Sequence, residues 1–142
     1  MCENANIGVL IVDDNIEYVQ LVREVLLSGG FENVHVAYDG LECLAILENL
    51  GDQIHVIALG LAMPGMTGFD VMQELSLRRV SPAGIVMWTG QASDDNRNVF
   101  FSHGSDNVLP SAFIYKGESP DVLIQGIRNA AHVVKVKRFG VE

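Results

Sequence analysis

The chain is 142 residues long and 49% hydrophobic, a composition that suits one compact domain with a continuous core and excludes wholesale disorder. Its formal net charge of −9 repels nucleic-acid phosphates and anionic lipid, which argues against nucleic-acid binding by this domain and against a membrane-surface role. No apolar run reaches the roughly 18 residues that a membrane span needs, and we expect a cytoplasmic protein.

Short apolar runs alternate along the chain with longer amphipathic stretches. The runs VLIV, IHVIAL and IVMW are almost entirely apolar, which is typical of parallel strands covered on both faces. In chain order, the patterns predict strand Gly8–Val12, helix Ile16–Leu27, strand Val34–Tyr38, helix Leu41–Leu50, strand Ile54–Leu59, a helix from Thr67 or Gly68 through Leu75, strand Gly84–Trp88, a short helix around Asp94–Ser102, strand Ala112–Tyr115, and a helix opened by Ser119 and Pro120.

This alternation predicts an α/β fold. Right-handed crossovers between successive strands give a doubly wound, five-stranded parallel sheet with about five helices on both faces. We expect residues 1–142 to form a single domain, with a core of about 7–135 and a tail or the start of a linker at 136–142. The stretch Gly104–Ser111 is rich in turn residues and is predicted to be an irregular loop.

Polar residues follow several of the predicted strands. Asp13 and Asp14 follow the first strand, Gly60 the third, Thr89 the fourth and Lys116 the fifth. The carboxyl ends of parallel strands meet at one edge of the sheet, where ligands bind in open α/β folds, so we expect these residues to converge there. The acids are either turn residues or oxygen ligands for Mg²⁺, and the lysine contacts either a phosphoryl group or one of the acids. The threonine either donates a hydrogen bond to a phosphoryl oxygen or is a satisfied strand-end hydroxyl.

Four segments at these strand ends resemble the signature segments of response-regulator receiver domains, the CheY-like (flavodoxin-like) superfamily. They are VLIVDDN, LGLAMPGMTGFDVM, VMWTG and FIYK, in the order of the family and spread over about residues 7–135. The resemblance implies the strand order 2-1-3-4-5 and a role in two-component phosphorelay signal transduction, in which a histidine kinase or an output domain is the protein partner. A second copy of the domain, in a homodimer, is another candidate partner.

The resemblance implies a role for each matching residue. Asp13 and Asp14 correspond to the acidic pair that holds Mg²⁺, with the backbone carbonyl of Ala62 as a further ligand. Thr89 corresponds to the switch hydroxyl, Phe113 to the aromatic switch residue and Lys116 to the lysine that contacts the phosphoryl group.

One position departs from the family pattern. The aspartate that accepts phosphate in the family precedes L-x-M-P-G-M, and Gly60 stands at that position here. Glycine has no side chain with which to attack phosphorus, so there is no catalytic residue at this position. With one carboxylate fewer, we expect Mg²⁺ to bind weakly or not at all, and Gly60 to leave a small polar hollow. Gly117 follows Lys116 where the family usually has proline, so we expect a trans peptide bond between them.

Three hypotheses for function remain. In the first, the chain is a receiver domain that signals by protein–protein contact without phosphorylation. It is then not an enzyme. The second is an ordinary phosphoaspartate-switched receiver in which the acceptor aspartate has been replaced by Gly60. The third is a small anion-binding sensor that uses the space beside Lys116.

Two groups of residues have less specific roles. Cys2 and Cys43 match neither a disulfide framework nor a CxxC metal site, and we interpret both as reduced thiols. Basic residues gather near the C-terminus, where they are either a solvated helix end that complements the helix dipole or a short contact for a partner. These residues are Arg128, Lys135, Lys137 and Arg138.

Overall fold

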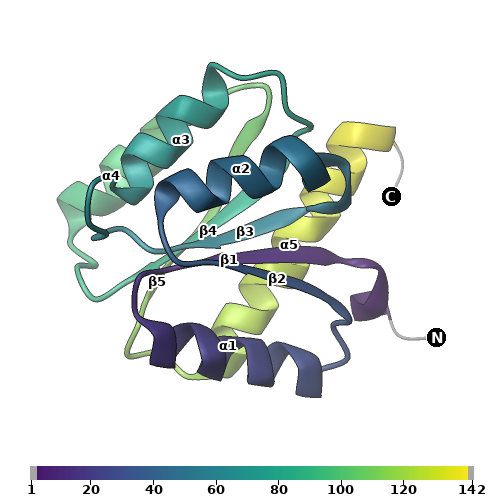
Figure 1. The fold of residues 1–142 in the computed structure, drawn as a ribbon, viewed down its shortest axis with the longest axis horizontal. Coiled ribbons are helices and arrows are strands. Elements are labelled where there is room, and N and C mark those ends of the chain that lie inside the picture. The colour runs from purple at the N-terminus through teal and green to yellow at the C-terminus, as the bar shows by residue number, and fades with distance from the viewer. Residues whose placement is uncertain (1–2, 141–142) are drawn as a thin grey trace.

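The computed structural model describes residues 3–140 and shows a single parallel sheet with helices on both sides (Figure 1). The strand order is β2-β1-β3-β4-β5, as the resemblance to receiver domains implies. The strands are β1 Gly8–Val12, β2 Asn33–Ala37, β3 Val56–Leu59, β4 Ala83–Thr89 and β5 Val108–Tyr115. The helices are α1 Ile16–Ser28, α2 Gly40–Leu50, α3 Gly68–Ser76, α4 Asp94–Ser102 and α5 Pro120–Phe139, with short 3₁₀ turns at Glu3–Asn6 and Gly51–Gln53.

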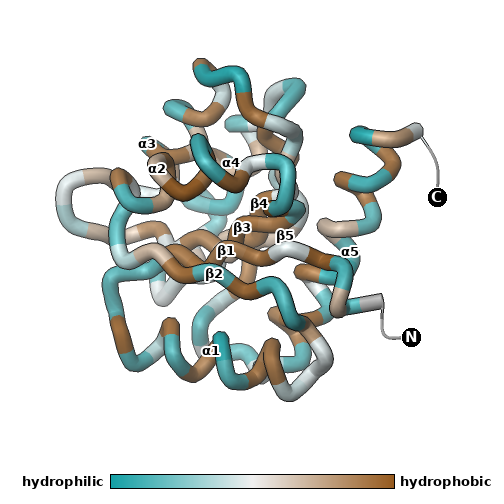
Figure 2. The backbone as a smooth tube through the Cα atoms, turned by 45° about the vertical axis from the view of Figure 1, so that its right-hand side comes forward, coloured by the Kyte–Doolittle hydropathy of each residue, from teal (hydrophilic) through white to brown (hydrophobic). Residues whose placement is uncertain are grey.

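The sheet separates two hydrophobic clusters. Helices α2, α3 and α4 cover one face, and their apolar side chains pack on strand residues such as Leu10, Ile57 and Met87. Helices α1 and α5 cover the opposite face, where they pack on residues such as Ile11 and Val86. Figure 2 shows the hydrophobic colour concentrated along β1, β3 and β4, which are buried from end to end. Among residues 3–140, no helix combines the length and the apolar content of a membrane span.

The sequence patterns predicted most element boundaries to within two residues. Strand β1 and helix α4 have the predicted bounds. Helix α3 begins at Gly68, and Thr67 caps it by accepting a hydrogen bond from the backbone N–H of Asp70, while the Asp70 carboxylate accepts one from the backbone N–H of Thr67. Both side chains are therefore occupied in capping α3. Within the described residues all peptide bonds are trans, including the one before Gly117.

The prediction of an irregular loop at Gly104–Ser111 was wrong for its second half, because β5 already begins at Val108. One residue of β5 has no pairing partner in β4. Ile85 of β4 pairs with Pro110, whereas the next residue, Val86, pairs with Ala112, so Ser111 forms a bulge. A proline is tolerated here because β5 is the edge strand and needs fewer backbone donors.

The C-terminal basic residues are more ordered than the sequence indicated. Helix α5 runs through Phe139, so residues 136–139 extend the helix rather than form a tail. The guanidinium group of Arg138 donates hydrogen bonds to the backbone carbonyls of Ile54 at 2.6 Å, Pro82 at 2.8 Å and Asp52 at 2.9 Å. Arg128 donates to the side chain of Asn4 at 3.1 Å. Both arginines therefore hold α5 against segments that are distant in the sequence.

The two cysteines form no disulfide framework within the described residues. Cys2 lies outside the described residues, and Cys43 is buried without a disulfide.

Replacing Arg138 with glutamine should lower the free energy of unfolding by about 1.5 kcal/mol, because several charge-assisted hydrogen bonds are lost together. Arg138→Lys should lose nearly as much, since an ammonium group cannot reproduce the planar fork of donors. Urea denaturation measures both. The exposed Lys137→Gln is the matched control and should change stability by less than about 0.5 kcal/mol.

His55, the residue directly before β3, is joined to β1 by a hydrogen bond that depends on pH. Its Nδ1 accepts from the backbone N–H of Gly8 at 2.9 Å, which requires that nitrogen to be unprotonated. Burial, together with the positive charges of Arg138 and Lys135, lowers the pKa of His55 below its usual value of 6.5. The unfolded chain therefore binds the proton first as the pH falls below about 6.5, and stability declines from there toward the lower folded-state pKa.

We expect His55→Asn to remove this part of the acid destabilisation, because the amide oxygen keeps an acceptor and does not titrate. Urea midpoints of both proteins at pH 7.5 and pH 5 provide the measurement. Equal losses in the two proteins would contradict this role of His55.

Candidate functional site

The structure brings four of the predicted site residues together at the carboxyl edge of the sheet. Asp13 follows β1, Gly60 follows β3, Thr89 ends β4 and Lys116 follows β5. Asp13 is only 2% exposed, and its Oδ2 accepts a hydrogen bond from the Lys116 ammonium at 2.7 Å. Its Oδ1 accepts from the backbone N–H of Asn15 at 2.9 Å. A buried carboxylate with these two partners has both its charge and its oxygens satisfied.

The small polar hollow that was expected at Gly60 is filled. A Cβ atom built on Gly60 would lie 2.5 Å from Oδ2 and 3.1 Å from Cγ of Asp13, and 3.3 Å from the backbone oxygen of Val12. The Asp13 carboxylate thus occupies the space that a side chain at position 60 would need. The φ angle of Gly60 lies outside the left-handed region, so the backbone does not itself require glycine here. The absence of a side chain is what allows Asp13 to lie there and pair with Lys116.

Two aromatic rings surround the ammonium group of Lys116. The Nζ atom lies 4.7 Å from the ring centre of Tyr18 and 5.0 Å from that of Trp88, distances typical of cation–π contacts. The two rings meet edge to face with their centres 5.1 Å apart. Lys116 is therefore held by a carboxylate on one side and two π-systems on the others, which restricts its position.

The two predicted switch residues face the interior. Thr89 is 3% exposed, and its Oγ1 accepts a hydrogen bond from the backbone N–H of Gln91 at 2.9 Å, so it closes the turn after β4. Phe113 is half-buried and packs against Phe100 of α4, with ring centres 5.6 Å apart. In this structure Thr89 is a satisfied strand-end hydroxyl, and Phe113 joins the core beneath α4.

The remaining predicted metal ligands do not complete a site. Asp14 and Ala62 are exposed, and Gly60 supplies no carboxylate. Within residues 3–140 no three His, Cys, Asp or Glu side chains are grouped so that they could hold a metal ion. Mg²⁺ requires several oxygen ligands in near-octahedral geometry, whereas the buried carboxylate of Asp13 is already bound to Lys116. The residues present therefore do not fit Mg²⁺.

Gly68 keeps the segment after β3 close to α3. Its backbone N–H donates to the carbonyl of Leu61 at 2.9 Å, and a Cβ atom at this position would lie 2.4 Å from the backbone oxygen of Gly60. The first turn of α3 thus presses directly on the chain at Gly60. Glycine at 68 is a structural requirement of the site that the sequence analysis treated only as a helix start.

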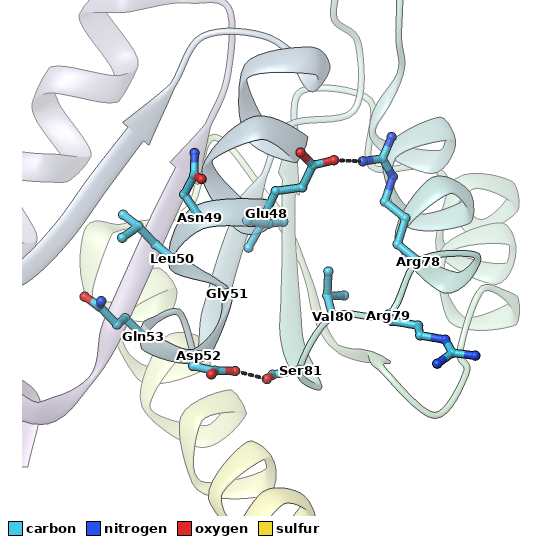
Figure 3. A pocket seen from close by; sticks show the side chains of 11 residues that line it. Glu48, Asn49, Leu50, Gly51, Asp52, Gln53, Arg78, Arg79, Val80 and Ser81 are labelled. Carbon is cyan, nitrogen blue, oxygen red and sulfur yellow. Dashed lines mark hydrogen bonds and ion pairs between the residues drawn. The ribbon is translucent and has the colours of Figure 1, made fainter.

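A cleft of about 510 Å³ lies away from this site, between the end of α2 and the segment that leads into β4 (Figure 3). Two polar contacts cross it, Arg78 with Glu48 at 2.5 Å and Ser81 with Asp52. None of the residues predicted to act at the site lines this cleft. Four of the polar side chains that face it are paired with one another, and its size alone does not make it functional.

Sequence reasoning missed two residues at the site, Tyr18 and Trp88. Tyr18 lies one helical turn after the acidic residues, and Trp88 directly precedes Thr89, so both are close to the motifs that the sequence analysis used.

The structure agrees with the interpretation of Cys43 as a reduced thiol, because this residue is buried and forms no disulfide. Burial, together with the charge of Asp39, raises its pKa to about 12, which keeps it protonated and unreactive.

Comparison with known proteins matches residues 9–128 to the response regulator receiver domain family. The chain belongs to this family. It is 35% identical over 105 residues to the transcriptional regulatory protein CpxR of Klebsiella pneumoniae, a match that covers 74% of this chain and 43% of CpxR. It is 34% identical over 139 residues to the nitrate/nitrite response regulator protein NarP of Escherichia coli, covering 96% of this chain and 60% of NarP. Among solved structures, a CheY-like receiver domain protein of Methanospirillum hungatei superposes with a TM-score of 0.77 at 26% identity, over 91% of this chain and 96% of that one.

The family membership and the strand order together identify this chain as a CheY-like receiver domain of two-component signal transduction. The chain spans less than half the length of the CpxR proteins and 60% of NarP. What it shares with these relatives is therefore the receiver domain.

Proposed function

We propose that this receiver domain signals by contact with protein partners without accepting phosphate on an aspartate. Gly60 takes the position of the phosphoacceptor in this proposal, and the domain is not an enzyme. The observation that carries it is the Asp13 carboxylate, which lies over Gly60 and is held by Lys116 at 2.7 Å. The lysine that would contact a phosphoryl group is thereby neutralised by a group of the chain itself.

The partners we propose are a histidine kinase or an output domain in the cytoplasm, and a second copy of the domain is a further candidate. Exposed apolar side chains on α4 and at the end of β5 support a protein contact on that side; they include Val99, Phe101 and Tyr115. The net charge of −9 supports the absence of nucleic-acid binding. We also propose that the domain works without Mg²⁺, in keeping with the occupied Asp13 carboxylate.

Incubation with acetyl phosphate and Mg²⁺, followed by intact mass spectrometry at neutral pH, tests the proposal. We expect no phosphoryl adduct on the native chain, because no carboxylate stands at position 60 to attack phosphorus. Gly60→Asp is the positive variant, and Gly60→Asn is the matched control of nearly equal size. A stoichiometric adduct on the native chain that hydroxylamine removes, as it removes an acyl phosphate, would contradict the proposal.

The second hypothesis, an ordinary receiver whose acceptor aspartate was replaced, is tested by the Gly60→Asp variant in the same experiment. The contact at 2.5 Å that a Cβ at position 60 would make is with the end of the Asp13 side chain, which can rotate away. If Gly60→Asp acquires phosphate readily, the rest of the site is competent for that chemistry. An anion-binding function has less support, because Asp13 occupies the place beside Lys116 that an anion would take.

A further inference from the structure

A mostly apolar cavity of about 170 Å³ lies between α1 and α5, beneath the turn that joins β5 to α5. Val22 and Val25 of α1 face Leu123 and Ile124 of α5 across it. Trp88 and Lys116 also line it, so the cavity shares two residues with the site at the carboxyl edge. No part of the receiver function described above uses this cavity.

Trp88 leaves a polar atom without a partner in this region. The residue is 5% exposed, and its Nε1–H has no hydrogen-bond acceptor within residues 3–140. Buried indole N–H groups in folded proteins almost always find an acceptor. Lys116 also has donors to spare, since it gives one of its three N–H groups to Asp13. A few polar donors among the residues that line an apolar cavity are the usual pattern of a small-molecule site.

We propose that this cavity binds a small uncharged ring compound that carries one hydrogen-bond acceptor, such as a carbonyl oxygen. Apolar cavities of about 150 Å³ hold one benzene molecule, so a single ring with a short substituent matches the volume here. The ring lies among the aliphatic side chains of α1 and α5, and the acceptor receives the N–H of Trp88.

The charges around the cavity select an uncharged compound. Lys116 is already neutralised by the buried Asp13, and Glu118 lines the same cavity, so an anion would face two carboxylates and only one ammonium group. A cation would meet the ammonium group of Lys116 directly. A neutral acceptor satisfies Trp88 without either repulsion. Because Lys116 lies over the Trp88 ring, the compound would contact the same lysine that holds Asp13 over Gly60.

Trp88 makes the test specific, because it is the single tryptophan of the chain. Acetophenone is the probe, added to the full chain labelled with ¹⁵N, and the indole Nε1–H resonance and the tryptophan fluorescence are followed. We expect a saturable downfield shift of the indole resonance and a change in fluorescence with the same midpoint. Isopropylbenzene has a similar size and no acceptor. It should leave the indole proton without a downfield shift, because it offers no acceptor to the Trp88 N–H. Benzoate should bind more weakly than acetophenone.

Two variants locate the binding. Val25→Phe and Ile124→Phe each fill the cavity from one wall, at positions that are only partly buried and so tolerate a larger side chain. Each should weaken acetophenone binding at least tenfold. Val99→Phe adds the same bulk on the exposed side of α4 and should leave binding unchanged. Circular dichroism of each variant confirms folding.

Three outcomes would overturn the proposal. One is an indole resonance that acetophenone leaves unmoved, which would show that no acceptor reaches Trp88 in this cavity. Another is a shift that persists unchanged in both cavity-filling variants, which would place the probe elsewhere. The third is an equal downfield shift of the indole proton with acetophenone and with isopropylbenzene, which would exclude a hydrogen bond from Trp88 to the ligand.

Discussion

Replacing Lys116 with methionine should lower the free energy of unfolding by about 3–5 kcal/mol, the usual cost of removing one partner of a buried ion pair. The variant leaves Asp13 2% exposed and without its counter-charge. Methionine keeps most of the aliphatic chain that packs against Tyr18 and Trp88, so the loss reports the ammonium group rather than the packing. Urea denaturation at neutral pH, with the slope checked for a constant value, measures the change.

A double variant separates the effect of the uncompensated Asp13 charge from a general loss of stability caused by substitution at the carboxyl edge of the sheet. Asp13→Asn combined with Lys116→Met removes both charges and should recover a large part of the lost stability, because no uncompensated carboxylate remains. Lys137→Met serves as a surface control, since Lys137 is exposed, and should change stability by less than about 0.5 kcal/mol. If Lys116→Met is as mild as this control, the Asp13–Lys116 pair does not hold the site together.

Introducing aspartate at position 60 should make the stability of the domain depend on Mg²⁺. The new carboxylate would need the space now filled by the Asp13 carboxylate, whose Oδ2 lies 2.5 Å from the position of a Cβ at Gly60. Crowded carboxylates repel one another and create a demand for a divalent cation, so Gly60→Asp should be less stable than the native chain in chelator. Mg²⁺ at a hundred times its dissociation constant should then add about 2.7 kcal/mol to the free energy of unfolding.

The native chain and Gly60→Asn are the comparisons for this prediction. Neither has a third carboxylate at the site, and we expect their urea midpoints to be the same in Mg²⁺ and in chelator. Asparagine at position 60 has almost the same size as aspartate, so it shares the steric displacement of Asp13 and isolates the effect of charge. A native chain that gains as much stability from Mg²⁺ as Gly60→Asp would refute the idea that the third carboxylate creates the metal site.

The elements of this fold were readable from the sequence where local patterns are strong. Strand β1 is a continuous apolar run, and Ser93 caps α4 directly before its first residue, so both have the predicted bounds. Strand β5 was predicted four residues too short because Pro110 and Ser111 are typical of loops. Only the pairing with β4 shows that the edge position tolerates the proline and that Ser111 forms a bulge.

What the sequence by itself determined is the set of chemical groups at the site. Parallel strands end at a common edge, so Asp13, Thr89 and Lys116 had to converge there. Gly60 cannot bind a phosphoryl group covalently, because its side chain is a hydrogen atom. Only the tertiary structure decided how these groups pair. Asp13 and Lys116 are 103 positions apart in the chain, and no local pattern encodes which of two neighbouring acids the lysine selects. The same holds for the rings around Lys116 and for the carbonyls held by Arg138, because such contacts depend on the packing of segments that are distant in sequence.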